Sequence, residues 1–304
     1  MVKFILKRLA AMIPVLLVVS ILVFLMVHLM EGDPAQIIAG EGATEEDIER
    51  VRIAQGFNLP LPEQYIRYMA NVLQGDLGTS IRTNRPVADE IMSKLPNTLV
   101  LSAAAILISV VIGISIGVLS ATKRYSFFDN ASMLVALLGL SVPPFYLGLM
   151  LMLLFCVILH WLPISAEVTL AGLILPAITL SARSMATIAR MTRSSMLEVM
   201  SQDYIQTARA QGFSERKVIF GHAMKNSMNT IVTVAGLQFG SLLGGAVITE
   251  QVFGWPGLGS FVVTSIRARD FPAVQSTILV LACMFVLINL LVDILYAFIN
   301  PRIK

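Results

Sequence analysis

The chain contains six long apolar stretches, and each one is long enough to cross a lipid bilayer as a helix. A helical span needs about 20 mostly apolar residues. The stretches that meet this requirement cover residues 9–30, 98–122, 133–159, 170–189, 231–249 and 276–299. Backbone polar groups in lipid must be satisfied within the protein, so uninterrupted runs of this length favour helices over barrel strands. The pattern predicts an all-α, polytopic membrane protein with six transmembrane helices.

The basic residues between these stretches predict how the helices are oriented. Short cytoplasmic loops carry an excess of Lys and Arg, whereas long loops cross a membrane largely regardless of charge. The short basic segments contain Lys3, Lys7, Arg8, Lys123, Arg124, Arg190, Arg193, Arg209, Arg216, Lys217, Lys225, Arg302 and Lys304. The connection over residues 160–169 carries no Lys or Arg, and the one between the last two spans carries only Arg267 and Arg269. An even number of spans with this distribution predicts that both termini are cytoplasmic.

The same pattern divides the chain into three regions. Residues 1–30 form the N-terminal cytoplasmic end and the first transmembrane helix, and residues 31–97 form an acid-rich extracytoplasmic loop region. Residues 98–300 form a core of five helices, whose largest cytoplasmic loop spans about residues 192–229. Within the extracytoplasmic region, Thr44 is expected to cap a helix, with Asp47 three residues later in place of the usual Glu.

Composition agrees with a membrane protein and argues against several functional classes. Charged residues make up only 13% of the chain, compared with roughly 25% in soluble domains. The net charge of +3 is too small to indicate nucleic-acid binding. Cys156 and Cys283 lie in predicted spans without a metal-binding spacing, and the three histidines are far apart, so no metal site is expected. The phosphate-loop, G-x-S-x-G and H-E-x-x-H motifs are missing, so we expect no catalytic residue and no cofactor in this chain.

Glycines inside the predicted spans recur at a spacing that favours close helix packing. Gly113 and Gly117 form one set, and Gly236, Gly240 and Gly244 form another. A spacing of four residues lets helix backbones approach closely in a membrane. Each set serves either packing within the chain or an interface with a second subunit.

Polar residues and prolines inside the spans are also open to more than one interpretation. Gln238 can hydrogen-bond to another helix or line a path. Arg183 lies near the middle of the fourth span, where a charge costs roughly 2.5–3.5 kcal/mol on insertion scales. It should therefore face the bundle interior, a water-filled path or a partner, unless the span is misplaced and Arg183 lies near its edge. Pro143 and Pro144 interrupt the third span, either as a structural kink or as the hinge of a gate.

The loop after the fourth span contains a segment suited to contact with another protein. A short helix with small residues at Ala208 and Ala210 can approach a partner closely. Gly212 permits a sharp turn, and Ser214 can cap a second short helix. The segment is either an amphipathic helix on the membrane surface or a docking element for a soluble partner.

This segment resembles the EAA loop found in permease subunits of bacterial ABC importers. The general family pattern is Glu-Ala-Ala, three residues, Gly, nine residues and Ile-x-Leu-Pro, of which Ala208 and Gly212 are kept. The departures resemble the dipeptide/oligopeptide branch, which reads Asp-Tyr-x-x-Thr-Ala-Arg-Ala-x-Gly with a later His-Ala-x-x-Asn. The matching residues here are Asp203, Tyr204, Thr207, Ala208, Arg209, Ala210 and Gly212, followed by His222, Ala223 and Asn226.

Further short matches to this branch extend over nearly the whole chain. They are Gly32-Asp33-Pro34, Gly75-Asp76-Leu77-Gly78, Arg85-Pro86-Val87, Gly254-Trp255-Pro256-Gly257-Leu258-Gly259 and Asn300-Pro301-Arg302. The outer motif Gly-Leu-Asp-x-Pro-Leu of the branch reads Gly-Phe-Asn-Leu-Pro-Leu here, over residues 56–61. Each motif alone is weak, and their shared order and spacing make the resemblance specific.

The resemblance implies a type I ABC importer permease fold in the bacterial cytoplasmic (inner) membrane. It implies four kinds of partner: the lipid bilayer, a second homologous permease that forms a heterodimer, two cytoplasmic ATPases that bind ATP and Mg²⁺, and an extracytoplasmic solute-binding protein. Residues 203–212 would couple the permease to the ATPases. The solutes of the branch include dipeptides, oligopeptides, glutathione, nickel and metal chelates, and nothing in the spans distinguishes them. The alternative is a secondary transporter or channel subunit, but no carboxylate for ion coupling is expected deep in these spans.

Overall fold

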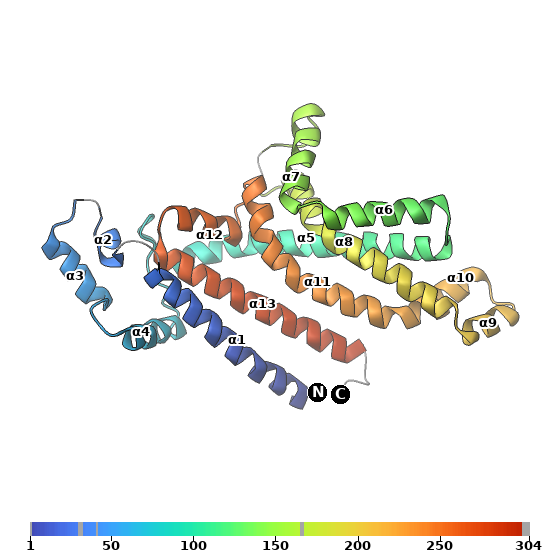
Figure 1. The fold of residues 1–304 in the computed structure, drawn as a ribbon, viewed down its shortest axis with the longest axis horizontal. Coiled ribbons are helices and arrows are strands. Elements are labelled where there is room, and N and C mark those ends of the chain that lie inside the picture. The colour runs from blue at the N-terminus through green and yellow to red at the C-terminus, as the bar shows by residue number, and fades with distance from the viewer. Residues whose placement is uncertain (1, 30–32, 41, 165–166, 300–304) are drawn as a thin grey trace.

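Long helices run side by side through most of the molecule, and a group of short helices lies at one end (Figure 1). The structure is a computed structural model and describes residues 2–29, 33–40, 42–164 and 167–299. Its helices are α1 (Val2–Leu29), α2 (Pro34–Ala39), α3 (Glu45–Gln55), α4 (Leu61–Leu73), α5 (Val87–Thr122), α6 (Phe127–Ser141), α7 (Pro144–Met152), η1 (Leu153–Ile158), α8 (Leu170–Met200), α9 (Asp203–Ala210), α10 (Glu215–Lys217), η2 (Val218–Ala223), α11 (Met224–Phe253), α12 (Leu258–Arg267) and α13 (Phe271–Ile299). Within the described ranges an isolated bridge between Thr79 and Pro86 is the only β contact, so the all-α prediction is confirmed.

The described helices account singly for four of the predicted spans, and for all six if each of two bent helix pairs is one span. Among the described residues, α1, α5, α8 and α13 are each long and apolar enough to cross a membrane, and two bent helix pairs pass the same test together. Several helices outrun their apolar stretches: α5 begins at Val87, and α8 continues to Met200. The extra turns persist because Val87 and Met196 are buried against other elements at the two ends of the bundle.

The third predicted span is broken rather than kinked. α6 ends at Ser141 and α7 begins at Pro144, and the two segments meet at 108°. Val142 and Pro143 are extended, with ψ values of 126° and 136°. Each of these two residues precedes a proline, and a proline disfavours the α conformation of the residue before it. Two successive prolines therefore end the helix. As a result α7 turns away from the direction of α6 and packs against α8 and α11, whereas α6 lies alongside α8 (Figure 1).

α5 and α8 pack closely at the centre of the bundle because α5 carries two glycines. A Cβ atom added at Gly113 would lie 2.9 Å from the carbonyl oxygen of Met185, and one at Gly117 would lie 2.6 Å from that of Ala189. These neighbours are backbone atoms of α8, so a side chain at either glycine would separate the helices. Packing within the chain therefore explains the spacing of this pair.

In the region between α1 and α5, a capping box starts α3, and hydrogen bonds to Asp270 anchor the later segment to the bundle. At the start of α3 the Thr44 hydroxyl accepts the backbone N–H of Asp47, and the Asp47 carboxylate accepts that of Thr44, as the sequence predicts. The Thr44 hydroxyl also donates a hydrogen bond to the Asp47 carboxylate. This bond and the one from the Thr44 backbone N–H lower the pKa of Asp47. Further along, Asp270 before α13 accepts the Ser80 hydroxyl and the backbone N–H of Ile81 at 3.1 Å.

The two ends of the bundle differ. α2, α3 and α4 lie at one end, called the insertion end below, and α9 and α10 lie at the other, called the loop end (Figure 1). α1 starts and α13 finishes toward the loop end (Figure 1), and there Arg8 pairs with Asp293 at 2.9 Å. This arrangement agrees with an even number of crossings. Gly32 and the Asn300-Pro301-Arg302 motif lie outside the described residues.

Candidate functional site

Arg183 lies on a side of α8 that the rest of the described chain leaves uncovered. Arg183, Thr187, Arg190 and Ser194 follow one another at spacings of four, three and four residues, and they share one side of the helix. Thr187 is half-buried and the other three are exposed. Arg183 makes none of the ion pairs found among the described residues. These four residues are called the polar face below. Arg183 and Thr187 fall within the predicted fourth span, where they need water or a polar partner, and Arg190 and Ser194 lie beyond its end.

Gln238 connects α11 to α8 beside the polar face. Its side-chain oxygen accepts a hydrogen bond from the hydroxyl of Ser184 at 3.2 Å. Ser184 is buried and directly follows Arg183 in the sequence, so this bond joins α11 to α8 next to the polar face. The hydrogen bond between helices that the sequence suggested for Gln238 is therefore present within the chain.

The three glycines of α11 do not share one environment. A Cβ atom at Gly240 would lie 2.7 Å from the side-chain oxygen of Asn289, and one at Gly236 would collide with Val292. Both neighbours belong to α13, so these two glycines serve packing within the chain. Gly244 is exposed with no atom near its Cβ position, and it adjoins the 53° bend of α11. Only Gly244 remains open to a second subunit.

α9 rests on the loop end of the bundle by one side. Ile205 is fully buried and Ala208 is 5% exposed, and they belong to one apolar cluster with Val118 of α5 and Met196 of α8. On the outer side Asp203, Tyr204, Thr207 and Ala210 are exposed, and Arg209 is half-buried. The sequence pattern predicted one shared contact for Ala208 and Ala210. They face opposite sides because two residues cover little more than half a helical turn, so Ala208 packs inside the chain.

The chain reverses direction directly after α9. Gly212 has a φ of +80°, which confirms the predicted turn. Arg209 and Glu215 form an ion pair at 3.0 Å across it. Ser214 occupies the predicted cap position of α10, although its side chain makes no capping hydrogen bond. The turn therefore projects from the bundle with a mixture of exposed charged and small residues.

Stacked side chains hold the base of this turn, and a separate ion pair joins α8 to α6. Phe213 stacks on His222, with ring centroids 5.6 Å apart, and the Lys217 ammonium lies 4.3 Å from the Phe213 centroid. On α8, Arg193 donates to both carboxylate oxygens of Asp129 at 2.6 and 2.7 Å, and Asp129 is fully buried. Such bidentate pairs are geometrically specific. The start of α6 and the last turns of α8 are therefore fastened together.

Glu250 is a buried carboxylate that the sequence analysis did not anticipate. It is fully buried near the end of α11, where the Thr98 hydroxyl donates to it at 2.6 Å and the backbone N–H of Ser260 donates at 3.0 Å. A side chain at Gly257 would collide with its carboxyl group. The sequence feature that could have indicated this site is the glycine-rich segment after Glu250, because glycines let backbone N–H donors approach a buried acceptor. Glu250 fixes the turn between α11 and α12.

Apolar spans, an uncovered polar face that begins within the fourth span and a projecting helical turn define a membrane-embedded permease. The chain belongs to the family described as binding-protein-dependent transport system inner membrane component. The model of this family matches residues 113–304, and the model of the N-terminal part of such membrane components matches residues 1–102.

Curated relatives cover the full length of the chain. It is 46% identical over 304 residues to the glutathione transport system permease protein GsiC of Escherichia coli O6:H1, and the match covers 100% of this chain and 99% of that protein. The GsiC proteins of Salmonella paratyphi A and Shigella flexneri show the same identity and the same coverage.

Two solved structures show that the fold is shared more widely. The MetNI methionine ABC transporter in inward-facing conformations matches with a TM-score of 0.55 at 18% identity, covering 69% of this chain and 96% of that chain. An amino acid ABC transporter with histidines matches with a TM-score of 0.53 at 17% identity, covering 70% and 94%. The chain is therefore a permease subunit of a binding-protein-dependent ABC importer, a multi-pass inner-membrane protein that works with ATPase and solute-binding partners.

Proposed function

We propose that the chain is one of two homologous permease subunits that together enclose a path for a short peptide-like solute. The solute is glutathione or a di- or oligopeptide, delivered by an extracytoplasmic binding protein. The identity to GsiC, whose name assigns it to glutathione transport, supports this solute class. Nickel and metal chelates, the other solutes that the resemblance implies, are the competing candidates for an uptake assay.

The polar face of α8 is the observation that carries this proposal. In a lone subunit it would expose Arg183 to lipid, at a cost of roughly 2.5–3.5 kcal/mol on insertion scales. A second subunit facing α8 would enclose Arg183 and Arg190 in a water-filled path, where their charges stay hydrated. Peptides and glutathione carry carboxylates, which guanidinium groups bind by paired hydrogen bonds.

The outer side of α9 is the proposed docking surface for an ATPase. Its exposed residues Asp203, Tyr204, Thr207 and Ala210 are free to contact a partner, while Ile205 holds the helix to the bundle. α8 is a single helix of 31 residues, about 46 Å long, that reaches from the bilayer to Ser201 beside α9. A displacement of α9 by a docked ATPase would therefore be transmitted along α8 to the polar face.

In this proposal the chain itself catalyses no reaction and holds no cofactor. ATP and Mg²⁺ bind to the ATPase subunits, and α9 and both termini lie in the cytoplasm, as the distribution of Lys and Arg favours. A secondary transporter is disfavoured because the charges of the polar face are arginines, whereas ion coupling uses carboxylates or histidines.

Uptake into proteoliposomes that contain the complete importer tests the proposal. With binding protein outside and ATP inside, labelled glutathione or trialanine should accumulate, and unlabelled nickel should not compete. Accumulation driven by an ion gradient without ATP would refute the assignment to an ATP-driven importer. If nickel competes with uptake and unlabelled peptides do not, nickel or its chelates would replace peptides as the proposed solute class.

Subunit composition and orientation need separate measurements. Native mass spectrometry of the purified importer should show two different permease chains with two ATPases, and two copies of this chain would contradict the heterodimer. A cysteine introduced by Ala210→Cys should react with a membrane-impermeant maleimide only when the cytoplasmic side is open. Labelling from the outer side of intact cells would reverse the proposed orientation.

A further inference from the structure

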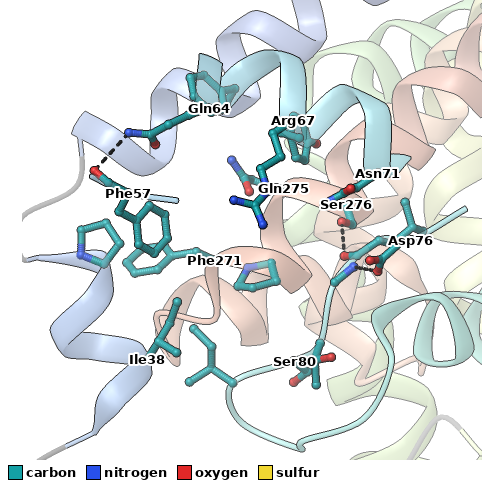
Figure 2. A pocket seen from close by; sticks show the side chains of 18 of the residues that line it. Ile38, Phe57, Gln64, Arg67, Asn71, Asp76, Ser80, Phe271, Gln275 and Ser276 are labelled. Atoms are coloured by element: carbon teal, nitrogen blue, oxygen red, sulfur yellow. Dashed lines mark hydrogen bonds between the residues drawn. The ribbon is translucent and has the colours of Figure 1, made fainter. Parts of the chain in front are cut away.

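A cavity of about 440 Å³ lies at the insertion end, between the short helices and the membrane helices (Figure 2). α4 supplies Gln64, Arg67 and Asn71 to its lining, and the start of α13 supplies Phe271 and Gln275. This volume falls within the range of about 300–1,000 Å³ typical of small-molecule sites. The cavity is separate from the polar face and from α9, and none of the residues that line it was singled out by the sequence analysis as a site residue.

Arg67 supplies a positive charge to this cavity. Its side chain extends from α4 toward Gln275 and Phe271 (Figure 2). The guanidinium lies against Gly56, where an added Cβ atom would be 2.9 Å from its Nη1 atom. Among the described residues Arg67 has no ion-pair partner. An unpaired guanidinium offers a planar set of N–H donors that matches a carboxylate.

Asp76 supplies a negative charge to the same cavity. One of its oxygens accepts the backbone N–H of Gly78 at 2.9 Å, and it forms no ion pair with a described residue. Phe57 and Phe271 add apolar surface to the lining. Tyr68 also lines the cavity, where its phenol is neutral at pH 7, and burial raises its pKa further, to about 12. The cavity thus holds one cation and one anion that do not neutralise each other.

We propose that this cavity binds the zwitterionic backbone of a short peptide or of glutathione, with its carboxylate on Arg67 and its ammonium group near Asp76. The choice of solute class rests on the proposed function, whereas the site itself is additional to the translocation path. A partly open cavity with opposite charges on two exposed side chains, Arg67 and Asp76, suits a small zwitterion better than the broad surface of a docking protein. Solute held there would stay close to the insertion end of the permease after its release from the binding protein.

Equilibrium binding to the complete permease–ATPase complex in lipid nanodiscs, without binding protein, tests this site. The probe is labelled trialanine, with trialanine amide and N-acetyl-trialanine as competitors that lack one charge each. Arg67→Gln should weaken binding of trialanine about tenfold or more, because a charge-assisted pair is lost. Asp76→Asn should weaken it too, and both modified peptides should compete poorly. Arg85→Gln is the matched control, since Arg85 is exposed in the same region and does not line the cavity.

The outcomes separate this inference from the proposed function. Equal affinity of the wild type and Arg67→Gln, or no trialanine binding by the wild type, would overturn the site even if the importer transports trialanine. Loss of binding-protein association in Arg67→Gln, with trialanine affinity unchanged, would make Arg67 a protein contact and overturn the site as well. Failure of peptide uptake alongside Arg67-dependent trialanine binding would count against the proposed function and leave the site standing.

Discussion

Replacing Ala208 by Glu places a carboxylate in the apolar cluster that holds α9 to the bundle. Ala208 is 5% exposed among Val118, Met196 and Ile205. Burial of an unpaired carboxylate costs several kcal/mol. The contacts that α9 would lose by detaching are smaller: about 1.5–3 kcal/mol for Ile205 and about 0.8 kcal/mol for the Ala208 methyl. Because the burial cost is larger, we expect α9 to detach rather than bury the charge.

Ala210→Glu is the matched control, because it adds the same side chain on the opposite side of the same helix. An exposed substitution changes the free energy of unfolding by about 0.5 kcal/mol or less. Amide hydrogen exchange should therefore be faster throughout α9 in Ala208→Glu and unchanged in Ala210→Glu. Both variants should lose uptake, the first through a detached α9 and the second through a blocked docking surface.

Two results would refute this reasoning. Unchanged exchange in Ala208→Glu would mean that α9 does not rest on Val118 and Met196. Normal uptake in Ala210→Glu, with the ATPase still copurifying, would mean that the outer side of α9 is not the docking surface. Membrane abundance of each variant, measured by immunoblot, separates these results from poor insertion.

Three further substitutions, one of them with a control variant, test other parts of the structure. Gly117→Ala should destabilise the protein by about 1–3 kcal/mol because its Cβ meets the α8 backbone, so the melting temperature should fall in a fluorescence-detected assay. Gly139→Ala, whose nearest contacts are an ordinary 3.7 Å, should not lower it, and equal melting temperatures would contradict the packing of α5 on α8. Glu250→Ala should lower the free energy of unfolding by about 1–3 kcal/mol, because the buried Thr98 hydroxyl loses its acceptor. The same melting assay measures this change, and unchanged stability would argue against that hydrogen bond. Arg183→Gln should reduce uptake at unchanged melting temperature and abundance, and normal uptake would remove Arg183 from the path.

The apolar pattern was sufficient to predict the class of fold, because a bilayer imposes a minimum length on every spanning helix. Local signals were also read correctly where a residue and its near neighbours decide the outcome. The Thr44–Asp47 capping box and the positive φ of Gly212 are examples. The break at Pro143 also depends on near neighbours, namely two adjacent prolines. The length of the apolar run nevertheless led to the prediction of one continuous span there.

Only the tertiary structure decided which neighbour each helix face meets. Ala208 and Ala210 look alike in sequence, yet one is buried in the chain and the other is exposed. Gly236 and Gly244 share a spacing, but α13 covers only the first. Glu250 follows an apolar run, and its burial depends on donors from Thr98 and Ser260, which other segments bring to it. Such contacts join residues far apart in the chain, so their energies are absent from any local pattern of apolar and polar positions.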